Sequence, residues 1–171
     1  IDVGSFVSKK VIPQLSDTGE VIDSLDLSNK KSELLVIIAN IKGAEITSYY
    51  NQISYLGFPF SISENFQMRN TNKTINESFK SLVEINKIVS ASQKKLVVYL
   101  SMCFGNPYGE VWNLDIIDKS ISKLISFSDA GSDFLFTSFI PDIGYHYALV
   151  NFAFRALPTI IFFSALMSIL Y

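Results

Sequence analysis

The order of apolar and polar positions along the first 130 residues alternates between strand-like and helix-like patterns. Short, almost uninterrupted apolar runs are typical of strands that are buried on both faces of a parallel sheet. Three such runs cover residues 34–39, 53–58 and 96–101, and residues 1–3 have the composition of the last residues of another strand. These four segments are the strands that the pattern predicts.

Between the strands, the spacing of apolar residues predicts helices. The clearest helix follows Thr74, because Thr74 and Glu77 form a capping box and apolar residues then recur at helical spacing. Shorter helices are predicted over residues 18–25, 43–52 and 113–124. Strands that alternate with helices indicate βαβ units, and the sequence therefore predicts an α/β fold with a parallel sheet.

The end of the chain differs in composition from the rest. Residues 131–171 hold three of the 30 charged residues but ten of the 23 aromatic residues. No charge occurs within residues 157–171, yet this stretch is shorter than the roughly 20 residues that a membrane-spanning helix needs. We expect a buried or poorly covered apolar helix here, and membrane association through residues 147–171 stays open as the alternative.

Length and composition narrow the class of protein. The chain has 171 residues, 49% of them hydrophobic and 18% charged, which excludes a disordered tail and indicates a folded domain. A net charge of −2 gives no electrostatic signature of nucleic-acid binding. The single cysteine, Cys103, cannot form an internal disulfide, which favours a reducing, cytoplasmic setting. A complete (β/α)₈ barrel typically needs roughly 250 residues, more than this chain has.

Polar side chains follow the predicted strands, where parallel βα folds place their chemistry. In chain order they are Asp2, Ser5, Asn40, Asn70, Asn72 and Asp129, the last after a short apolar run at residues 125–127. Together they would suit an oxygen-rich substrate, although from spacing alone their use in turns and helix caps is the simpler interpretation. His146 is the only histidine, so a site with two histidine ligands cannot be built within this chain. We expect Cys103 to be a core residue.

The order of residues in the loops identifies a family more specifically than their composition does. Residues 1–15 read IDVGSFVSKKVIPQL. This segment resembles the one after the second strand of 3-hydroxy-3-methylglutaryl-CoA lyases. In that family an acidic residue precedes Ser-Phe-Val-Ser-Pro-Lys, and Pro-Gln follows. Further matches follow in family order at residues 40–43, 63–79 and 101–108. The resemblance thus covers residues 1–112. Its Ser-Phe-Val-Ser element separates this lyase from other members of the same barrel superfamily.

The resemblance implies a partial (β/α)₈ TIM barrel, truncated at both ends and covering roughly strands 2 to 6. On this interpretation residues 1–130 form the lyase domain, and residues 131–171 form a degenerate or atypical hydrophobic segment that is helical. The family's Arg-Asp-Gly-Leu-Gln motif would precede Ile1, and its metal-binding His-x-His does not occur in the chain.

The resemblance also implies an activity, the retro-Claisen cleavage of 3-hydroxy-3-methylglutaryl-CoA to acetyl-CoA and acetoacetate. The family uses a divalent cation, Mg²⁺ or Mn²⁺, whose ligands are absent from this sequence, so we expect the chain alone to be inactive. The acyl-CoA substrate is the expected partner, and homo-oligomerisation stays open. The resemblance assigns catalytic positions to Asp2 and Asp129 and substrate-binding positions to Ser5, Asn40, Asn70 and Asn72.

Two alternatives remain at this point. The chain could be a non-catalytic, degenerate fragment whose apolar end associates with a membrane or a partner. It could also be another carbon–carbon lyase or synthase of the same barrel superfamily, although the Ser-Phe-Val-Ser element argues against that.

Overall fold

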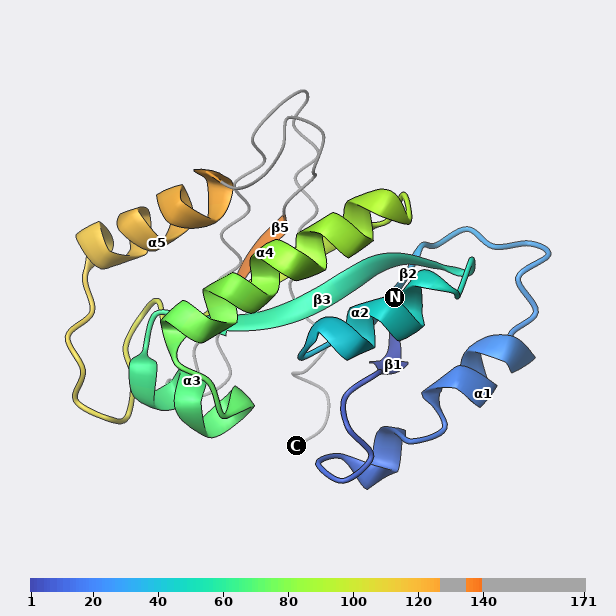
Figure 1. The fold of residues 1–171 in the computed structure, drawn as a ribbon, viewed down its shortest axis with the longest axis horizontal. Helices are drawn as coiled ribbons and strands as arrows, with labels where there is room; N and C mark the ends of the chain where they lie inside the picture. Colours follow the sequence, from blue (N-terminus) through green and yellow to red (C-terminus); the bar gives the residue numbers. More distant parts are fainter. Residues whose placement is uncertain (127–134, 140–171) are drawn as a thin grey trace.

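Five parallel strands, joined by helices, form one sheet in a computed structural model that describes residues 1–126 and 135–139. The strands lie side by side in chain order, from β1 at one edge to β5 at the other (Figure 1). Their bounds are β1 (Asp2–Ser5), β2 (Leu34–Ile37), β3 (Ile53–Ser61), β4 (Lys95–Ser101) and β5 (Leu135–Phe139). The helices are α1 (Thr18–Ser24), α2 (Ile41–Ser48), α3 (Glu64–Thr71), α4 (Ile75–Ala91) and α5 (Leu114–Ser126), with a short 3₁₀ helix at Pro13–Leu15.

This topology is that of a segment of a (β/α)₈ barrel. Each strand pairs in parallel with the next along the chain, and at least one helix lies between every two strands in the sequence. The longest register joins β3 to β4, from Tyr55 opposite Lys95 to Ser61 opposite Ser101. The predicted α/β fold with consecutive parallel βα units is therefore confirmed.

One face of the sheet packs against the helices and forms the core. Val36, Phe58 and Val98, one from each of three neighbouring strands, are 0% exposed. Leu82 and Ile85 of α4 are equally buried and belong to the same apolar cluster. In Figure 1, α2 and α4 cross in front of this face. The apolar runs of the sequence are thus explained by burial beneath helices.

The opposite side of the sheet, which we call the inner face, carries Leu35, Ile37, Gly57 and Tyr99. Paired residues of parallel strands share a face, and the register places Ile37 beside Gly57. A Cβ atom on Gly57 would lie 2.7 Å from Ile37 Cδ1 and 2.7 Å from Tyr99 Cε2. A larger residue at this position would force the side chains of Ile37 and Tyr99 to shift.

Side-chain caps fix the starts of several helices, among them α2, α3 and α4. The side chain of Asn40 accepts a hydrogen bond from the amide of Gly43 at the start of α2. Ser63 caps α3 in the same way. At the start of α4, Thr74 and Glu77 form the capping box that the sequence predicts. Each cap satisfies an amide that the first helical turn leaves unpaired.

Three elements differ from the sequence expectation. Residues 64–71 form α3, for which the apolar pattern predicts no helix. The Ser63 cap and a buried Gln67, hydrogen-bonded to Ser78, replace an apolar stripe. The apolar run at 125–127 was expected to close a strand, but Ile125 and Ser126 end α5, whose apolar face continues to Ile125. Strand β5, beyond the predicted boundary at residue 130, pairs with β4.

Several sequence expectations fall on residues 127–134 and 140–171, which lie outside the described residues. They include Asp129, His146, the apolar helix expected at the end of the chain, and membrane association through residues 147–171. Within the described ranges, no helix combines the length and the apolar character needed to cross a membrane.

Candidate functional site

A pocket of about 660 Å³ lies at the carboxyl ends of β1 and β2. The loop after β1 and the first turns of α1 and α2 surround it. Two of the predicted substrate-binding residues, Ser5 and Asn40, line it together. This position corresponds to the edge of the sheet at which parallel βα folds bind their ligands.

Two aromatic rings lie between the elements that form this pocket. The ring of Phe6 packs against that of Tyr50, with centroids 5.1 Å apart and planes tilted by 34°. On the other side Tyr50 contacts α1, since a Cβ on Gly19 would lie 2.5 Å from its hydroxyl oxygen. Both aromatic side chains line the pocket, so it combines an apolar surface with a polar rim.

Ser5 is buried, with an exposed fraction of 4%, and its hydroxyl holds two segments in place. The hydroxyl donates to the carbonyl of Ile37 at 3.1 Å and accepts from the amide of Val7 at 3.2 Å. The first bond joins β1 to β2, and the second fixes the start of the loop. A ligand at this hydroxyl would therefore donate to the oxygen, because the proton is already committed to Ile37.

Asn40 is half-buried and caps α2, with Oδ1 accepting from the Gly43 amide at 2.9 Å. The cap commits this oxygen, so only the Nδ2 group of the side chain is suited to donate to a ligand. Asn40 thus fulfils the structural role that spacing alone favoured and also lines the pocket.

Asp2 lies on the inner face, in register with Leu35, and does not line the pocket of Ser5 and Asn40. Burial raises the pKa of Asp2, although a hydrogen bond from the Gly4 amide to Oδ1 at 3.3 Å opposes the change. Desolvation, with the negative charge of Asp2, raises the pKa of Tyr99 to about 12. The carboxylate of Asp2 thus contributes to the raised pKa of Tyr99, although β2 and β3 lie between their strands.

Asn70 and Asn72 lie elsewhere. Asn70 is in the last turn of α3, and Asn72 ends that helix in the left-handed conformation with φ of 53°. Both residues are exposed, and neither lines the pocket of Ser5 and Asn40. Of the predicted residues, the structure thus brings Ser5 and Asn40 into one pocket, with Asp2 on the inner face.

A carboxylate that sequence reasoning missed orders the loop after β4. Glu110 accepts hydrogen bonds from the hydroxyl of Ser63 and from the backbone and side-chain nitrogens of Asn65, the latter two at 3.1 and 3.0 Å. Burial would raise the pKa of Glu110, but these bonds outweigh it and lower the pKa. The loop is thereby fixed to the start of α3. The residues are more than 40 positions apart, so local sequence carried no signal of this pairing.

The residues present do not fit a divalent-cation site. Within residues 1–126 and 135–139, no group of three His, Cys, Asp or Glu side chains is arranged to hold a metal ion. Asp2 is the only acidic residue in the five described strands. Cys103 is buried and donates to the carbonyl of Leu100 at 3.4 Å, which confirms it as a core residue.

Consecutive parallel βα units, with a pocket at the carboxyl ends of the strands, define this chain as part of a barrel of the (β/α)₈ type. Among solved structures, this fold is similar to that of a hydroxymethylglutaryl-CoA lyase from Bacillus subtilis, which superimposes with a TM-score of 0.70 at 26% identity, over 80% of this chain and 44% of that one. The motif-based resemblance to hydroxymethylglutaryl-CoA lyases is confirmed.

Curated sequences agree with this similarity. The mitochondrial hydroxymethylglutaryl-CoA lyase of Macaca fascicularis is 32% identical over 110 residues, which are 63% of this chain and 33% of the relative. Hydroxymethylglutaryl-CoA lyase YngG of Bacillus subtilis is 29% identical over 134 residues, 78% of this chain and 42% of the relative. No family model matches the chain. The chain thus spans between a third and a half of the length of these two relatives.

Proposed function

We propose that this chain forms the acyl-CoA-facing part of a carbon–carbon lyase of the hydroxymethylglutaryl-CoA lyase type. One observation carries the proposal: Ser5 and Asn40, which lie in two separate motifs of the resemblance, line a single pocket at the carboxyl ends of neighbouring strands. The similarity to lyases over 110 to 134 residues supports the same family-level function.

In the proposed reaction, a base takes the proton from the tertiary hydroxyl of 3-hydroxy-3-methylglutaryl-CoA. The hydroxyl carbon becomes the ketone of acetoacetate as the carbon–carbon bond breaks, and the acetyl-CoA enolate that leaves takes up a proton. Asp2 and Asp129 are the proposed catalytic carboxylates. The raised pKa of Asp2 makes its carboxylate a stronger base than an aspartate whose pKa is not shifted.

Ser5, Asn40, Asn70 and Asn72 are the proposed contacts to the substrate. Since the proton of Ser5 is used by Ile37, Ser5 would accept from a substrate hydroxyl, whereas Asn40 would donate from Nδ2 to a carbonyl or carboxylate oxygen. Asn70 and Asn72 are exposed at the end of α3 and would contact a more distant part of an extended acyl-CoA.

We assign no step to a metal ion, because the described residues lack the donor set that a divalent cation needs. The expected behaviour of residues 1–171 alone is therefore binding without cleavage. A purified chain would be titrated with 3-hydroxy-3-methylglutaryl-CoA by calorimetry, and acetoacetate would be assayed with and without Mn²⁺.

We expect saturable binding and no acetoacetate above the metal-free control. Ser5→Ala should weaken binding, whereas Ser24→Ala, which removes an exposed hydroxyl bonded to Val21 of α1, should not. Metal-dependent turnover would contradict the non-cleaving assignment, and absence of acyl-CoA binding would contradict the proposed function itself.

The second candidate is a non-catalytic, degenerate chain. It is favoured by the internal hydrogen bonds of Ser5 and Asn40, which hold the fold together without any ligand. The same titration separates the two candidates, because a purely structural chain would not discriminate between Ser5→Ala and Ser24→Ala.

A further inference from the structure

The backbone amide of Ser5 is held by a side chain of α1. Its N–H donates to Oγ1 of Thr18 at 3.1 Å, and both residues are buried, with exposed fractions of 4% and 3%. The Thr18 hydroxyl in turn donates to the carbonyl of Leu15 at 2.9 Å. Two consecutive hydrogen bonds thus join the end of β1 to the 3₁₀ helix that closes the following loop.

The side chain of Thr18 also lies close to the backbone of β1. Gly4 has a φ of 152°, and a Cβ atom on it would lie 2.7 Å from Oγ1 and 2.8 Å from Cγ2 of Thr18. The register of β1 against β2 shifts between Asp2 and Gly4. Irregularities of this kind change the direction of nearby side chains. Thr18 therefore packs on the irregular part of β1, immediately before the residue whose amide it holds.

The Ser5 hydroxyl has one acceptor position left. It donates to the carbonyl of Ile37 and accepts from the amide of Val7. A hydroxyl oxygen has two lone pairs, so one of them remains for a ligand. The direction of this lone pair depends on the backbone position of Ser5, which the hydrogen bond to Thr18 helps to fix.

We propose that Thr18 is a positioning residue of the acyl-CoA site. By holding the amide of Ser5, it sets the direction in which the Ser5 oxygen accepts a hydrogen bond from the tertiary hydroxyl of the substrate. The inference rests on the proposed function and adds a residue to it. Thr18 lines the same pocket as Ser5, but its proton is used by Leu15 and its oxygen by the Ser5 amide. It therefore acts through Ser5.

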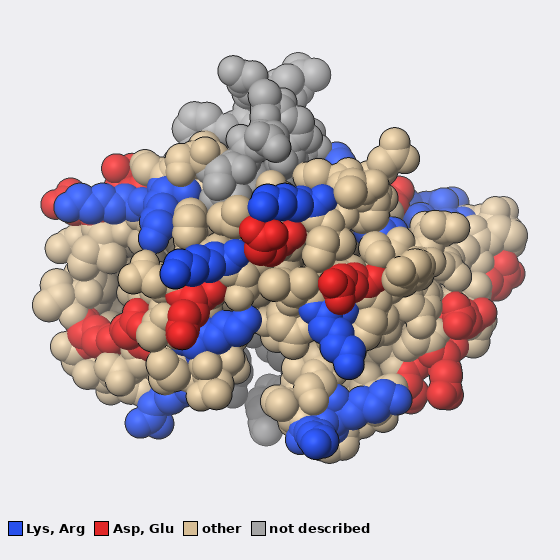
Figure 2. Space-filling model, in the orientation of Figure 1, with Lys and Arg blue, Asp and Glu red and all other residues tan. Residues whose placement is uncertain are grey.

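The hydrogen bonds that position Ser5 join neutral groups, whereas the charged side chains around the pocket are exposed. Figure 2 shows basic side chains over the loop after β1 and acidic side chains along α1. Salt screens interactions between exposed charges. A selectivity that depends on Thr18 should therefore be the same at low and at physiological salt.

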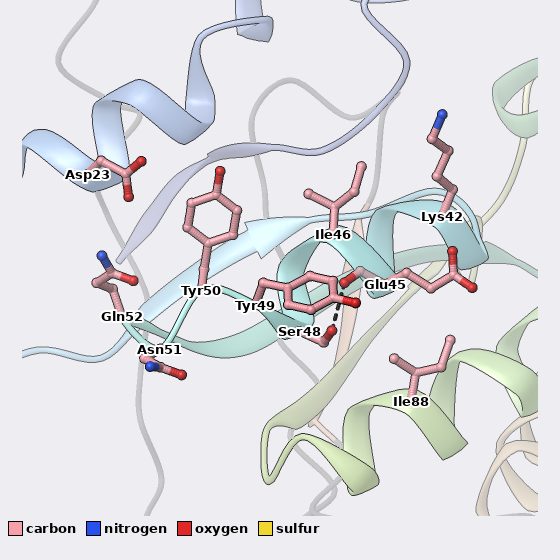
Figure 3. Close-up of a pocket in the computed structure, with 10 residues that line it drawn as sticks. All are labelled: Asp23, Lys42, Glu45, Ile46, Ser48, Tyr49, Tyr50, Asn51, Gln52 and Ile88. Carbon is pink, nitrogen blue, oxygen red and sulfur yellow. Dashed lines mark hydrogen bonds between the residues drawn. The ribbon is translucent and has the colours of Figure 1, made fainter.

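A neighbouring pocket provides a contrast within the same region. It has a volume of about 800 Å³ and lies between α1, α2 and α4, beside the turn at residues 49–52 (Figure 3). Both pockets are lined by Asp23, Lys42, Ile46 and Tyr50. Ser5 and Thr18 line only the first pocket, so the binding of a ligand in the neighbouring pocket should not respond to the Thr18 hydroxyl.

The test measures selectivity between two ligands that differ by one hydroxyl. 3-Hydroxy-3-methylglutaryl-CoA and 3-methylglutaryl-CoA, which lacks the tertiary hydroxyl, would be titrated by calorimetry into the unchanged chain and its variants. Thr18→Val removes the hydroxyl at nearly constant volume, and Thr18→Ser keeps it. Thr47→Val is the matched control, because Thr47 is 0% exposed and its hydroxyl donates to the carbonyl of Gly43 in α2. Circular dichroism would check that each variant folds.

We expect the unchanged chain to bind the hydroxylated ligand about fivefold more tightly, an effect typical of one hydrogen bond. Thr18→Val should reduce this ratio to less than about twofold, whereas Thr18→Ser and Thr47→Val should keep it. The amide proton of Ser5 should also exchange with solvent faster in Thr18→Val than in Thr47→Val, because its acceptor is gone. If Thr18→Val does not fold, Thr18→Ala, in which a water molecule can reach the Ser5 amide, replaces it with the same expected ratio.

The outcomes separate this inference from the proposed function. If Thr18→Val keeps the preference for the hydroxylated ligand while Ser5→Ala loses it, Thr18 does not position Ser5, and the acyl-CoA function stands. Equal weakening of both ligands in Thr18→Val would show a purely structural role and overturn the inference, as would an equal loss of preference in Thr47→Val. If neither ligand binds the unchanged chain, the proposed function fails and the inference fails with it.

Discussion

The two faces of the sheet differ in how they are covered and in what they carry. On the helix-facing side, Phe58 and Val98 are fully buried under α4 and its neighbours. On the inner face, Tyr99 and Ile37 are only half-buried, and Asp2 lies in the same layer. Alternate residues of the same strands thus face opposite sides of the sheet. One set packs in the core, and the other set includes Asp2, a proposed catalytic residue.

The different burial of the two faces explains which residues can take a functional role without disturbing the packing of the core. Removing a core side chain leaves a cavity that the surrounding helices cannot fill, so the helix-facing residues are constrained by packing. On the inner face, Tyr99 keeps part of its surface exposed, and desolvation raises the pKa values of Asp2 and Tyr99. The predictions below test this contrast, from the largest effect to the smallest.

The largest expected loss of unfolding free energy follows from a substitution on the helix-facing side of the sheet. Phe58→Ala should lower the free energy of unfolding by about 3 to 5 kcal/mol, because it empties a fully buried site. Tyr99→Ala on the inner face should cost clearly less, since that side chain is only half-buried. Urea unfolding of both variants measures the difference. Equal losses would show that the two faces are packed alike.

Gly57→Ala should lower the free energy of unfolding by about 1 to 3 kcal/mol, through overpacking against Ile37 and Tyr99. The control is the same substitution in a Tyr99→Ala background, where one of the two clashing side chains is gone. Urea unfolding should then show a smaller loss. An identical loss in both backgrounds would mean that Tyr99 does not lie over Gly57.

At the pocket, Asn40→Ala should cost about 1 kcal/mol of unfolding free energy, because the Gly43 amide loses its cap. Asn40→Asp keeps an acceptor oxygen and should retain most of the stability. If both variants were equally destabilised in urea, the cap would not be the reason for the loss.

A further prediction concerns the dependence of stability on pH. The pKa of Tyr99 is raised from 10.0 to about 12 in the folded chain, so the folded state holds this proton more tightly than the unfolded state. This contribution to stability is complete below pH 10 and is lost as pH rises toward 12. Tyr99→Phe should flatten the fall in stability over this window, measured by urea unfolding at several pH values.

The charge of Asp2 offers a control for the pH effect. Asp2→Asn should lower the pKa of Tyr99, because a negative charge that favours the protonated phenol is gone, while desolvation still holds the pKa above 10.0. NMR titration of tyrosine ring carbons would follow this. An unchanged Tyr99 titration would show that the two residues do not interact across the inner face.

The sequence predicted those parts of the fold whose signals are local. Apolar runs located β2 and β4, and the capping box at Thr74 and Glu77 located α4. Helix α3 was not predicted because it has no apolar stripe. The Ser63 cap and the hydrogen bonds of Gln67 stabilise it instead. Strand β5 was missed because it lies in a segment whose apolar residues occur without clear periodicity.

As with the fold, the sequence predicted only those features of the candidate site that follow from local signals. Parallel strands bring the residues after their carboxyl ends together, and this holds for Ser5 and Asn40, which line one pocket, but not for Asn70 and Asn72, which lie at the end of α3. The hydrogen bond from Ser63 to Glu110 joins residues 47 positions apart, so no local sequence pattern predicts it.

The most direct test of the proposed function is an NMR titration of the ¹⁵N-labelled chain with 3-hydroxy-3-methylglutaryl-CoA. The amide resonances of Ser5, Asn40 and their neighbours around the pocket should shift most, and saturably. Amides of the turn at residues 49–52 that line only the neighbouring pocket should shift little. Shifts centred on that turn or on α5, or no saturable shift at all, would contradict the assignment of an acyl-CoA site to the carboxyl ends of β1 and β2.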